Sequence, residues 1–298
     1  MRGVTFGLGT TLAALAAVGV AGVAPGTGAG AVHRAGSAPR SIQTLAPDHR
    51  LPDWARAGKG GKGHGHGGSS TSGYGWSSSN WSGYAVTPAS RSYTAISGSW
   101  TVPSVAASKG ATYSATWIGI DGFNNDYLIQ TGTEQDYYDG SPHYATWWTD
   151  SENNFEEQPF SLPVSPGDVM TASIIEQAGG GPWTITLTND TAEARGATDS
   201  SVTELVSSYD GPGASAEWIM EAPTIGGRVA PLADYGETNF TGAAVATSVG
   251  GTLTSPGFTI ADGGYMVQHR SVVSIPSEPG TTRNDFNIGY GSTPPSAP

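Results

Sequence analysis

Two glutamates, Glu217 and Glu221, lie four residues apart in the apolar stretch AEWIMEAP. If this stretch is a β-strand, both glutamates and Ile219 share one face, while Trp218 and Met220 point to the other. One face would then pack in a core and the other could carry out chemistry. A carboxylate with an ordinary pKa of about 4.3 can act as a general base in acidic surroundings. The strand rise separates the two Cα atoms by about 13 Å, so a catalytic partner is expected from another strand.

The common hydrolase signatures do not supply that partner. The chain has no cysteine, no Asp-Thr/Ser-Gly triplet, no His-Glu-x-x-His pair and no Gly-x-Ser-x-Gly elbow. A Ser/His/Asp triad in the folded part would depend on His143 or His269, and no motif supports one.

Short alternating segments between turn residues indicate the elements that position these groups. In each of the stretches ATYSATWIGIDG, VMTASI and WTITLTND, every second residue falls on the same face and is mostly apolar or aromatic. This pattern predicts half-buried strands. Turn signals such as Pro166-Gly167-Asp168 recur between them, and no long stretch shows a helical period. With 44 glycines and 20 prolines in 298 residues, the chain is predicted to hold one mostly β domain of the sandwich type.

Five stretches in a fixed order carry a family resemblance. They are SNWSGYAV, TWIGIDG, LIQTGTEQ, AEWIMEAP and PLADYG, and the match that contains them runs from about Asn80 to about Ile275. In this order they resemble the eqolisins, the glutamic peptidase family. The resemblance is to a bacterial-type member. Fungal members also use cysteines and this chain has none, so its stability is expected to rest on the sheets alone.

The resemblance implies an all-β, lectin-like (concanavalin A-like) sandwich of two antiparallel sheets and an acid endopeptidase activity. Its catalytic glutamate and glutamine fall on Glu221 and Gln130. Glu221 would take a proton from the attacking water, and the Gln130 amide would donate to the developing oxyanion. No metal and no organic cofactor is implied.

Seven further residues are candidates for supporting the site or binding substrate. They are Asp121, Glu134, Trp147, Trp81, Asn80, Glu217 and Thr149. Glu217 is expected to be structural, bonding to neighbouring backbone or to a polar group across the cleft. Thr149 and Ala145 stand where the family carries acids, so the hydrogen-bond network around Gln130 is expected to differ.

The chain divides into four predicted segments. Residues 1–31 read as a signal peptide, because an apolar run follows Met1-Arg2 and ends at small residues. Residues 32–73 form a Gly- and His-rich propeptide or linker with six Lys/Arg and two acids, a net charge of +4. The peptidase domain covers residues 74–285, and residues 286–298 hold a strand end and a disordered tail.

Charge and composition also predict location and partners. Residues 74–298 hold six Lys/Arg against 23 acids, a net charge of −17, which would attract the basic segment near neutral pH. We expect a secreted, extracellular monomer that acts on polypeptides, without nucleic acid and without membrane contact after signal removal.

Two other functions remain open from the residues alone. Sandwich glycosidases carry Glu-x-Asp-x-Glu on a strand, and the EWIME of this chain copies the spacing, with Ile219 in place of the central acid. Their retaining chemistry requires carboxyl groups about 5 to 5.5 Å apart. A non-catalytic lectin would instead use the tryptophans to stack on sugar rings.

Overall fold

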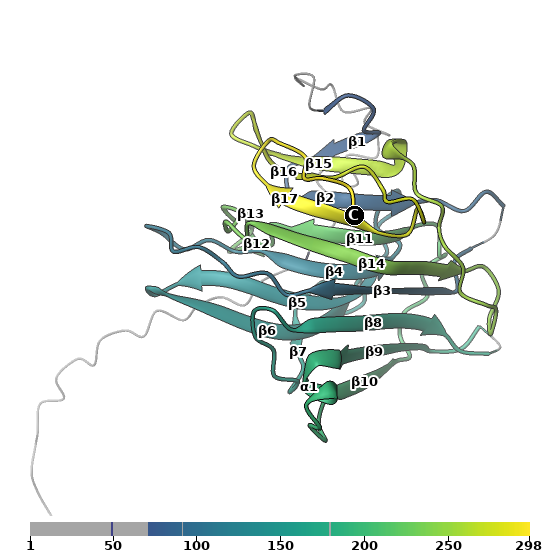
Figure 1. Ribbon diagram of the computed structural model, residues 1–298. Coiled ribbons are helices and arrows are strands. Elements are labelled where there is room, and N and C mark those ends of the chain that lie inside the picture. Colours follow the sequence, from purple (N-terminus) through teal and green to yellow (C-terminus); the bar gives the residue numbers. More distant parts are fainter. Residues whose placement is uncertain (1–48, 50–70, 91, 179) are drawn as a thin grey trace, which may run out of the picture. The chain divides into compact units, whose positions relative to one another are not determined.

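The computed structural model of the protein describes residues 49, 71–90, 92–178 and 180–298 (Figure 1). The expected signal peptide, and all of the expected propeptide except residues 49 and 71–73, lie outside the described residues. The described residues belong to one compact unit, Thr44–Pro298. Among them, no helix is long and apolar enough to cross a bilayer.

Strands make up nearly all regular structure of the described chain, which confirms the all-β prediction. In order they are β1 (Trp76–Ser78), β2 (Trp81–Val86), β3 (Ala95–Thr101), β4 (Ala115–Ile120), β5 (Ile129–Tyr138), β6 (Ser141–Asp150), β7 (Gln158–Pro159), β8 (Val169–Glu176), β9 (Trp183–Asn189), β10 (Ser201–Val206), β11 (Ala216–Glu221), β12 (Thr224–Ile225), β13 (Arg228–Val229), β14 (Glu237–Ala246), β15 (Gly263–Gln268), β16 (Ser271–Pro276) and β17 (Phe286–Tyr290). The described helices are α1 (Asp190–Ala194) and a 3₁₀ turn, Ile260–Asp262.

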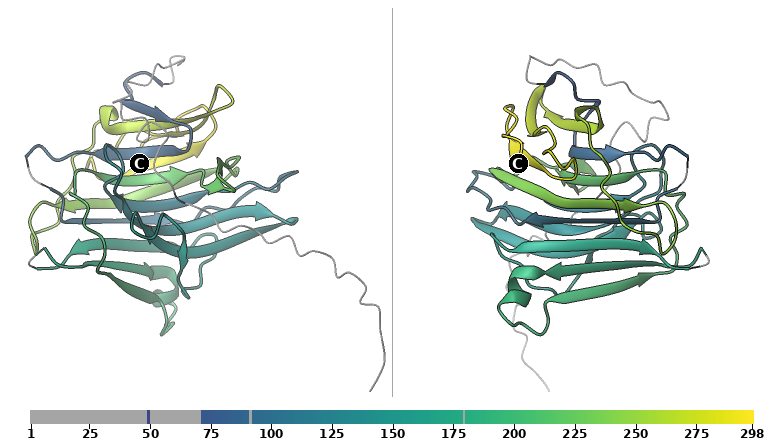
Figure 2. Two further views of the ribbon diagram at one scale, coloured as in Figure 1. Left: turned by 180° about the vertical axis from the view of Figure 1, so that it is seen from behind. Right: turned by 45° about the vertical axis from the view of Figure 1, so that its right-hand side comes forward.

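The strands form one hydrogen-bonded path that doubles back on itself. Its order is β10-β9-β8-β3-β14-β17-β16-β15-β2-β11-β4-β5-β6-β7, with β1 added in parallel to β15. The β15–β16 hairpin joins one layer, which runs from β10 to β16, to a second layer that runs from β2 to β7. Figures 1 and 2 show the strands stacked from β10 at one end to β15 and β1 at the other. All named pairs except β1–β15 are antiparallel, as expected for the sandwich.

The two layers enclose the main core. In β11, the side chains of Trp218 and Met220 enter this core, and Trp218 Nε1 donates to the carbonyl of Ser97 on β3 across the layers (3.0 Å). The opposite face of the second layer carries a separate apolar cluster that includes Trp117 and Trp147. The core face of β11 therefore packs as predicted and leaves Glu217 and Glu221 on the other face.

Burial follows the predicted alternation only in part. β8 and β9 alternate between buried and half-buried positions, as expected. β4, which lies within the stretch ATYSATWIGIDG, is buried on both faces, so the prediction of a half-buried strand was wrong there. The reason is that Ile118 packs between the layers, while Trp117 packs in the separate apolar cluster of the opposite face.

The last strand lies inside the first layer. β17 pairs with β14 on one side and with β16 on the other, so the sheet includes residues beyond 285. In the tail that was expected to be disordered, the Ser296 carbonyl accepts a hydrogen bond from Asn287 Nδ2 (2.9 Å).

Candidate active site

Strand register brings the predicted site residues onto one face of the second layer. Strands β11, β4, β5 and β6 lie side by side in that order. One row across them contains Glu221, Ala115, Glu134 and Ala145, and a second row contains Glu217, Gly119, Gln130 and Thr149. Because side chains alternate along a strand, these rows and the one between them project from the same face.

The row between them explains the glycine that follows Gln130-Thr131. This row contains Ile219, Trp117, Gly132 and Trp147. A Cβ atom on Gly132 would lie 2.6 Å from Trp117 Cβ and 2.3 Å from the Thr116 carbonyl oxygen. Glycine is therefore required for Trp117 to sit beside β5 and reach the site.

His49 is the residue on which the site converges. Gln130 Nε2 donates to the His49 carbonyl oxygen (2.8 Å), and His49 Nδ1 lies 3.3 Å from Glu221 Oε2. The imidazole stacks on the Trp147 indole, with ring centroids 3.6 Å apart and an angle of 4° between the planes. The predicted residues Gln130, Glu221 and Trp147 thus meet at one completely buried residue.

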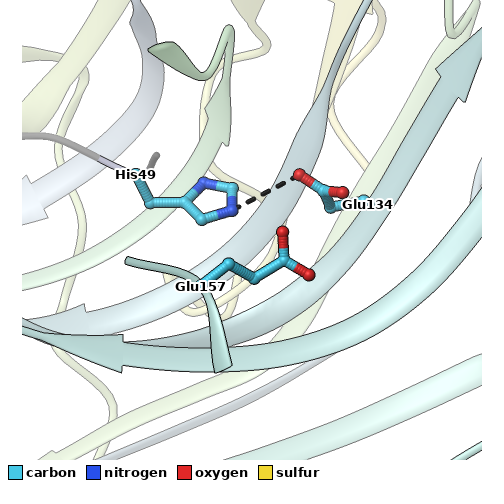
Figure 3. Close-up of side chains that lie close together, drawn as sticks. All are labelled: His49, Glu134 and Glu157. Atoms are coloured by element: carbon cyan, nitrogen blue, oxygen red, sulfur yellow. Dashed lines mark ion pairs between the residues drawn. The ribbon is translucent and has the colours of Figure 1, made fainter. Parts of the chain in front are cut away.

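Two more carboxyl groups surround the imidazole (Figure 3). His49 Nε2 forms an ion pair with Glu134 Oε1 at 3.4 Å. The carboxyl group of Glu157, from the segment just before β7, completes a cluster in which one ligand atom of each residue lies within 4.8 Å of the others. Neutral imidazole and carboxylates are ligands that zinc accepts.

The charge state of His49 fits ion pairing better than metal ligation. Burial lowers the pKa of His49, but its contacts with Glu134 and Glu221 outweigh burial and raise the pKa to about 10. Both ring nitrogens then carry protons at neutral and acidic pH, and a protonated nitrogen cannot bind a metal. Burial likewise raises the pKa of Glu157 to about 8, with a further increase from the charge of Glu134.

Glu221 is held by a tryptophan as well as by His49. Trp117 Nε1 donates to Glu221 Oε2 (2.8 Å), and Trp81, the β2 residue opposite Glu221, packs edge-on against Trp117. Glu221 Oε1 has no hydrogen-bond partner among the described residues. Burial raises the pKa of Glu221, although His49 and Trp117 oppose the increase by stabilising the carboxylate.

Asp121 organises a loop rather than touching the other site residues. Its two carboxylate oxygens accept hydrogen bonds from four groups: the Tyr209 hydroxyl, the Gly213 and Ala214 amides and the Asn125 side chain, at 2.6 to 2.8 Å. Asp121 has φ = 70°, the left-handed region that aspartate tolerates better than most residues. It therefore fixes the loop that leads into β11.

Asn80 and Thr149 also act through the backbone around the site. The Asn80 carbonyl accepts from the amide of Ala222, next to Glu221, and so fixes the end of β11. The Thr149 hydroxyl lies 2.6 Å from Asn153 Oδ1 and 2.8 Å from the Glu156 carbonyl oxygen, so it supports the turn before β7. Gln130 Oε1 has no hydrogen-bond partner in the described part of the chain.

Glu217 is completely buried, and neither carboxyl oxygen has a hydrogen-bond partner of strict geometry among the described residues. The Ser215 side chain is close enough to stabilise the carboxylate and opposes the effect of burial on its pKa. Burial raises the pKa of Glu217 well above its ordinary value, and the nearby charge of Asp121 adds to the increase. A neutral, protonated carboxyl group is the form that such a site favours.

This burial makes stability depend on pH in an unusual direction. The pKa of Glu217 is higher in the folded protein than in the unfolded chain. Its contribution to the stability of the fold is therefore complete below the unfolded pKa and is lost as the pH rises through the folded pKa. We expect the wild-type melting temperature to fall between about pH 5 and about pH 8, and Glu217→Gln to be at least about 3 °C more stable than wild type at the higher pH. Thermal melts at both pH values, with the exposed Glu237→Gln as control, measure this. Equal pH slopes for Glu217→Gln and wild type would contradict it.

Sequence reasoning missed three residues of the site: His49, Glu157 and Trp117. His49 was only one of the histidines of the basic segment, and no spacing linked it to the domain. Glu157 follows Gln130 by 27 positions, and it comes close to His49 and Glu134 only because β6 and the turn after it reverse the chain. Trp117 could have been found, because it lies one strand away from Glu221 on the same predicted face.

Comparisons with known proteins identify a family and similar folds. The model of the Peptidase A4 family matches residues 79–278. Aspergillopepsin-2 of Aspergillus niger is 30% identical over 211 residues, covering 62% of this chain and 70% of that protein. The fold is similar to scytalido-glutamic peptidase solved with a transition state analog inhibitor (TM-score 0.57) and to SCP-B of the Eqolisin family solved with the tripeptide Ala-Ile-His (TM-score 0.52). Each of these two is 22% identical and covers 71% of this chain and 98% of its own.

Proposed function

Because the chain belongs to the Peptidase A4 family and is a hydrolase of peptide bonds, we propose that it works as a secreted acid endopeptidase with Glu221 and Gln130 as its catalytic pair. The observation that carries this proposal is that the side chains of Glu221 and Gln130 both contact the same residue of a polypeptide segment, His49. Gln130 donates to its carbonyl oxygen, and Glu221 lies against its side chain.

The chemistry follows from these two contacts. A substrate carbonyl in the position of the His49 carbonyl would receive the Gln130 amide as an oxyanion donor. Glu221 Oε1 is free of described partners and can hold the attacking water. Glu221 would take a proton from this water as its oxygen attacks the carbonyl carbon. The proton then passes to the amine nitrogen as the carbon–nitrogen bond breaks.

Family membership sets aside the glycosidase and lectin alternatives. A retaining pair also needs its carboxyl groups about 5 to 5.5 Å apart, whereas the strand rise separates the Cα atoms of Glu217 and Glu221 by about 13 Å. Glu217 lies in the row of Gln130 rather than in the row of Glu221 and Glu134.

A pH series of protein digestion tests the proposal. Burial raises the pKa of Glu221 above 4.5, and a general base works best near its own pKa. We therefore expect the acid limb of the kcat/KM profile above 4.5 and maximal digestion of casein below pH 7, with no release of sugar from β-glucan. A maximum above pH 7 would contradict the proposal.

The N-terminal basic segment is proposed to be a propeptide that covers the site. Its net charge of +4 against −17 supports attraction near neutral pH, and the position of His49 supports contact with Glu221. The same digests test this point, because sequencing of the N-terminus shows whether active protein has lost residues 32–73. Full activity with this segment still attached would rule out the propeptide.

A further inference from the structure

The surroundings of His49 form a pocket with a specific composition. The Trp147 indole lies parallel to the imidazole, and the Glu221 carboxyl group lies against its Nδ1. The carboxyl groups of Glu134 and Glu157 lie beside the ring (Figure 3). His49 is completely buried there, although it belongs to no strand and no helix.

This composition matches a protonated imidazole better than the side chain of lysine or leucine. The ring is flat and can stack fully on an indole, and its positive charge is attracted by the indole face. Its two N–H groups point in different directions, and here one lies toward Glu221 and the other toward Glu134. Lysine has a compact charge but no plane to stack, and leucine would leave the carboxylates without a partner.

The pocket lies next to the position expected for the reacting carbonyl group, because His49 occupies both places. His49 offers its carbonyl oxygen to Gln130 and its side chain to the pocket. Its Nδ1 also lies against Glu221 Oε2, one of the two oxygens of the proposed base. A histidine bound in this way would therefore hold a peptide on the site while it occupies the group that should activate water.

We propose that Trp147, Glu134 and Glu157 form a subsite for the protonated histidine side chain of a polypeptide, that a peptide bound through it inhibits the enzyme, and that His49 is its intramolecular ligand. The inference rests on the proposed function, because it assumes that Glu221 and Gln130 are the reacting groups.

The test supplies the ligand in trans to a full-length chain whose own histidine has been removed. In His49→Ala, an eight-residue peptide with the sequence of residues 46–53 is compared with peptides carrying Leu or Lys in place of histidine. We expect the histidine peptide to inhibit casein digestion at least about tenfold more strongly than either variant at about pH 5, where imidazole is charged. Among chains that still carry residues 32–73, the wild type should be inhibited less than His49→Ala, because its tethered histidine competes.

Variants of the pocket give a matched comparison. Glu134→Gln, which removes the partner of the imidazole Nε2, should reduce the preference for histidine over leucine by several-fold, whereas Glu156→Gln, at an exposed position before β7, should preserve it. Equal inhibition by the histidine and leucine peptides would overturn the inference, as would rapid cleavage of the histidine peptide next to its histidine. These results are distinct from failure of the proposed function, which would appear as digestion of casein by Glu221→Gln.

Discussion

Glu221→Gln is expected to lower kcat for protein digestion by about 10³- to 10⁴-fold while the protein remains folded. The amide has nearly the same shape and can still accept the hydrogen bond from Trp117 Nε1, but it cannot take a proton from water. Steady-state rates on casein, with circular dichroism to establish folding, measure the effect.

Glu217→Gln is the matched control, because Glu217 lies on the same strand and face and is equally buried. It should keep most of the wild-type kcat. Near wild-type digestion by folded Glu221→Gln would remove Glu221 from the mechanism.

Gln130→Ala is expected to lower kcat by about 10²- to 10³-fold, the effect of losing one oxyanion donor. Its Nε2 reaches the carbonyl oxygen of His49 at 2.8 Å, which is the contact that a substrate carbonyl would make. The loss should fall on kcat more than on KM, because the donor matters most when negative charge develops on the oxygen. Single-turnover rates at saturating substrate separate the two.

Two further variants check this assignment. Thr149→Val changes the residue opposite Gln130, but the Thr149 hydroxyl faces the turn before β7, so kcat should change by no more than about threefold. The double variant Gln130→Ala/Glu221→Gln should be scarcely slower than Glu221→Gln alone, because both residues act on one water and one carbonyl. Fully additive losses would show that the two residues act in separate steps.

The sequence predicted the strand that carries Glu221 and the face on which its carboxyl group lies, because both follow from the period of a strand. Gln130 was identified through its motif, and the register of β4 and β5 then explained how it joins Glu221. Burial of both faces of β4 was not predictable from alternation, because it depends on side chains from strands far away in sequence.

The contacts of His49 could not be predicted from local sequence patterns for a related reason. Its partners follow it by between 81 and 172 positions, and the residues flanking it carry no period of a strand or helix. Charge suggested that the basic segment meets the acidic domain, but charge acts over a broad surface and does not specify which residue enters the site. Stacking and ion pairing are short-range, so only the folded arrangement identifies the partner.

The position of β17 has a consequence for biosynthesis. A chain grows from its N-terminus, and this strand, which follows all the other named strands along the chain, fills the gap between β14 and β16. Until Phe286–Tyr290 has emerged from the ribosome, both neighbours present unpaired backbone groups and the first layer is split in two. The first layer therefore cannot be completed before residue 290 has been made, and a nascent chain that stalls before residue 286 exposes two unpaired sheet edges to chaperones and proteases.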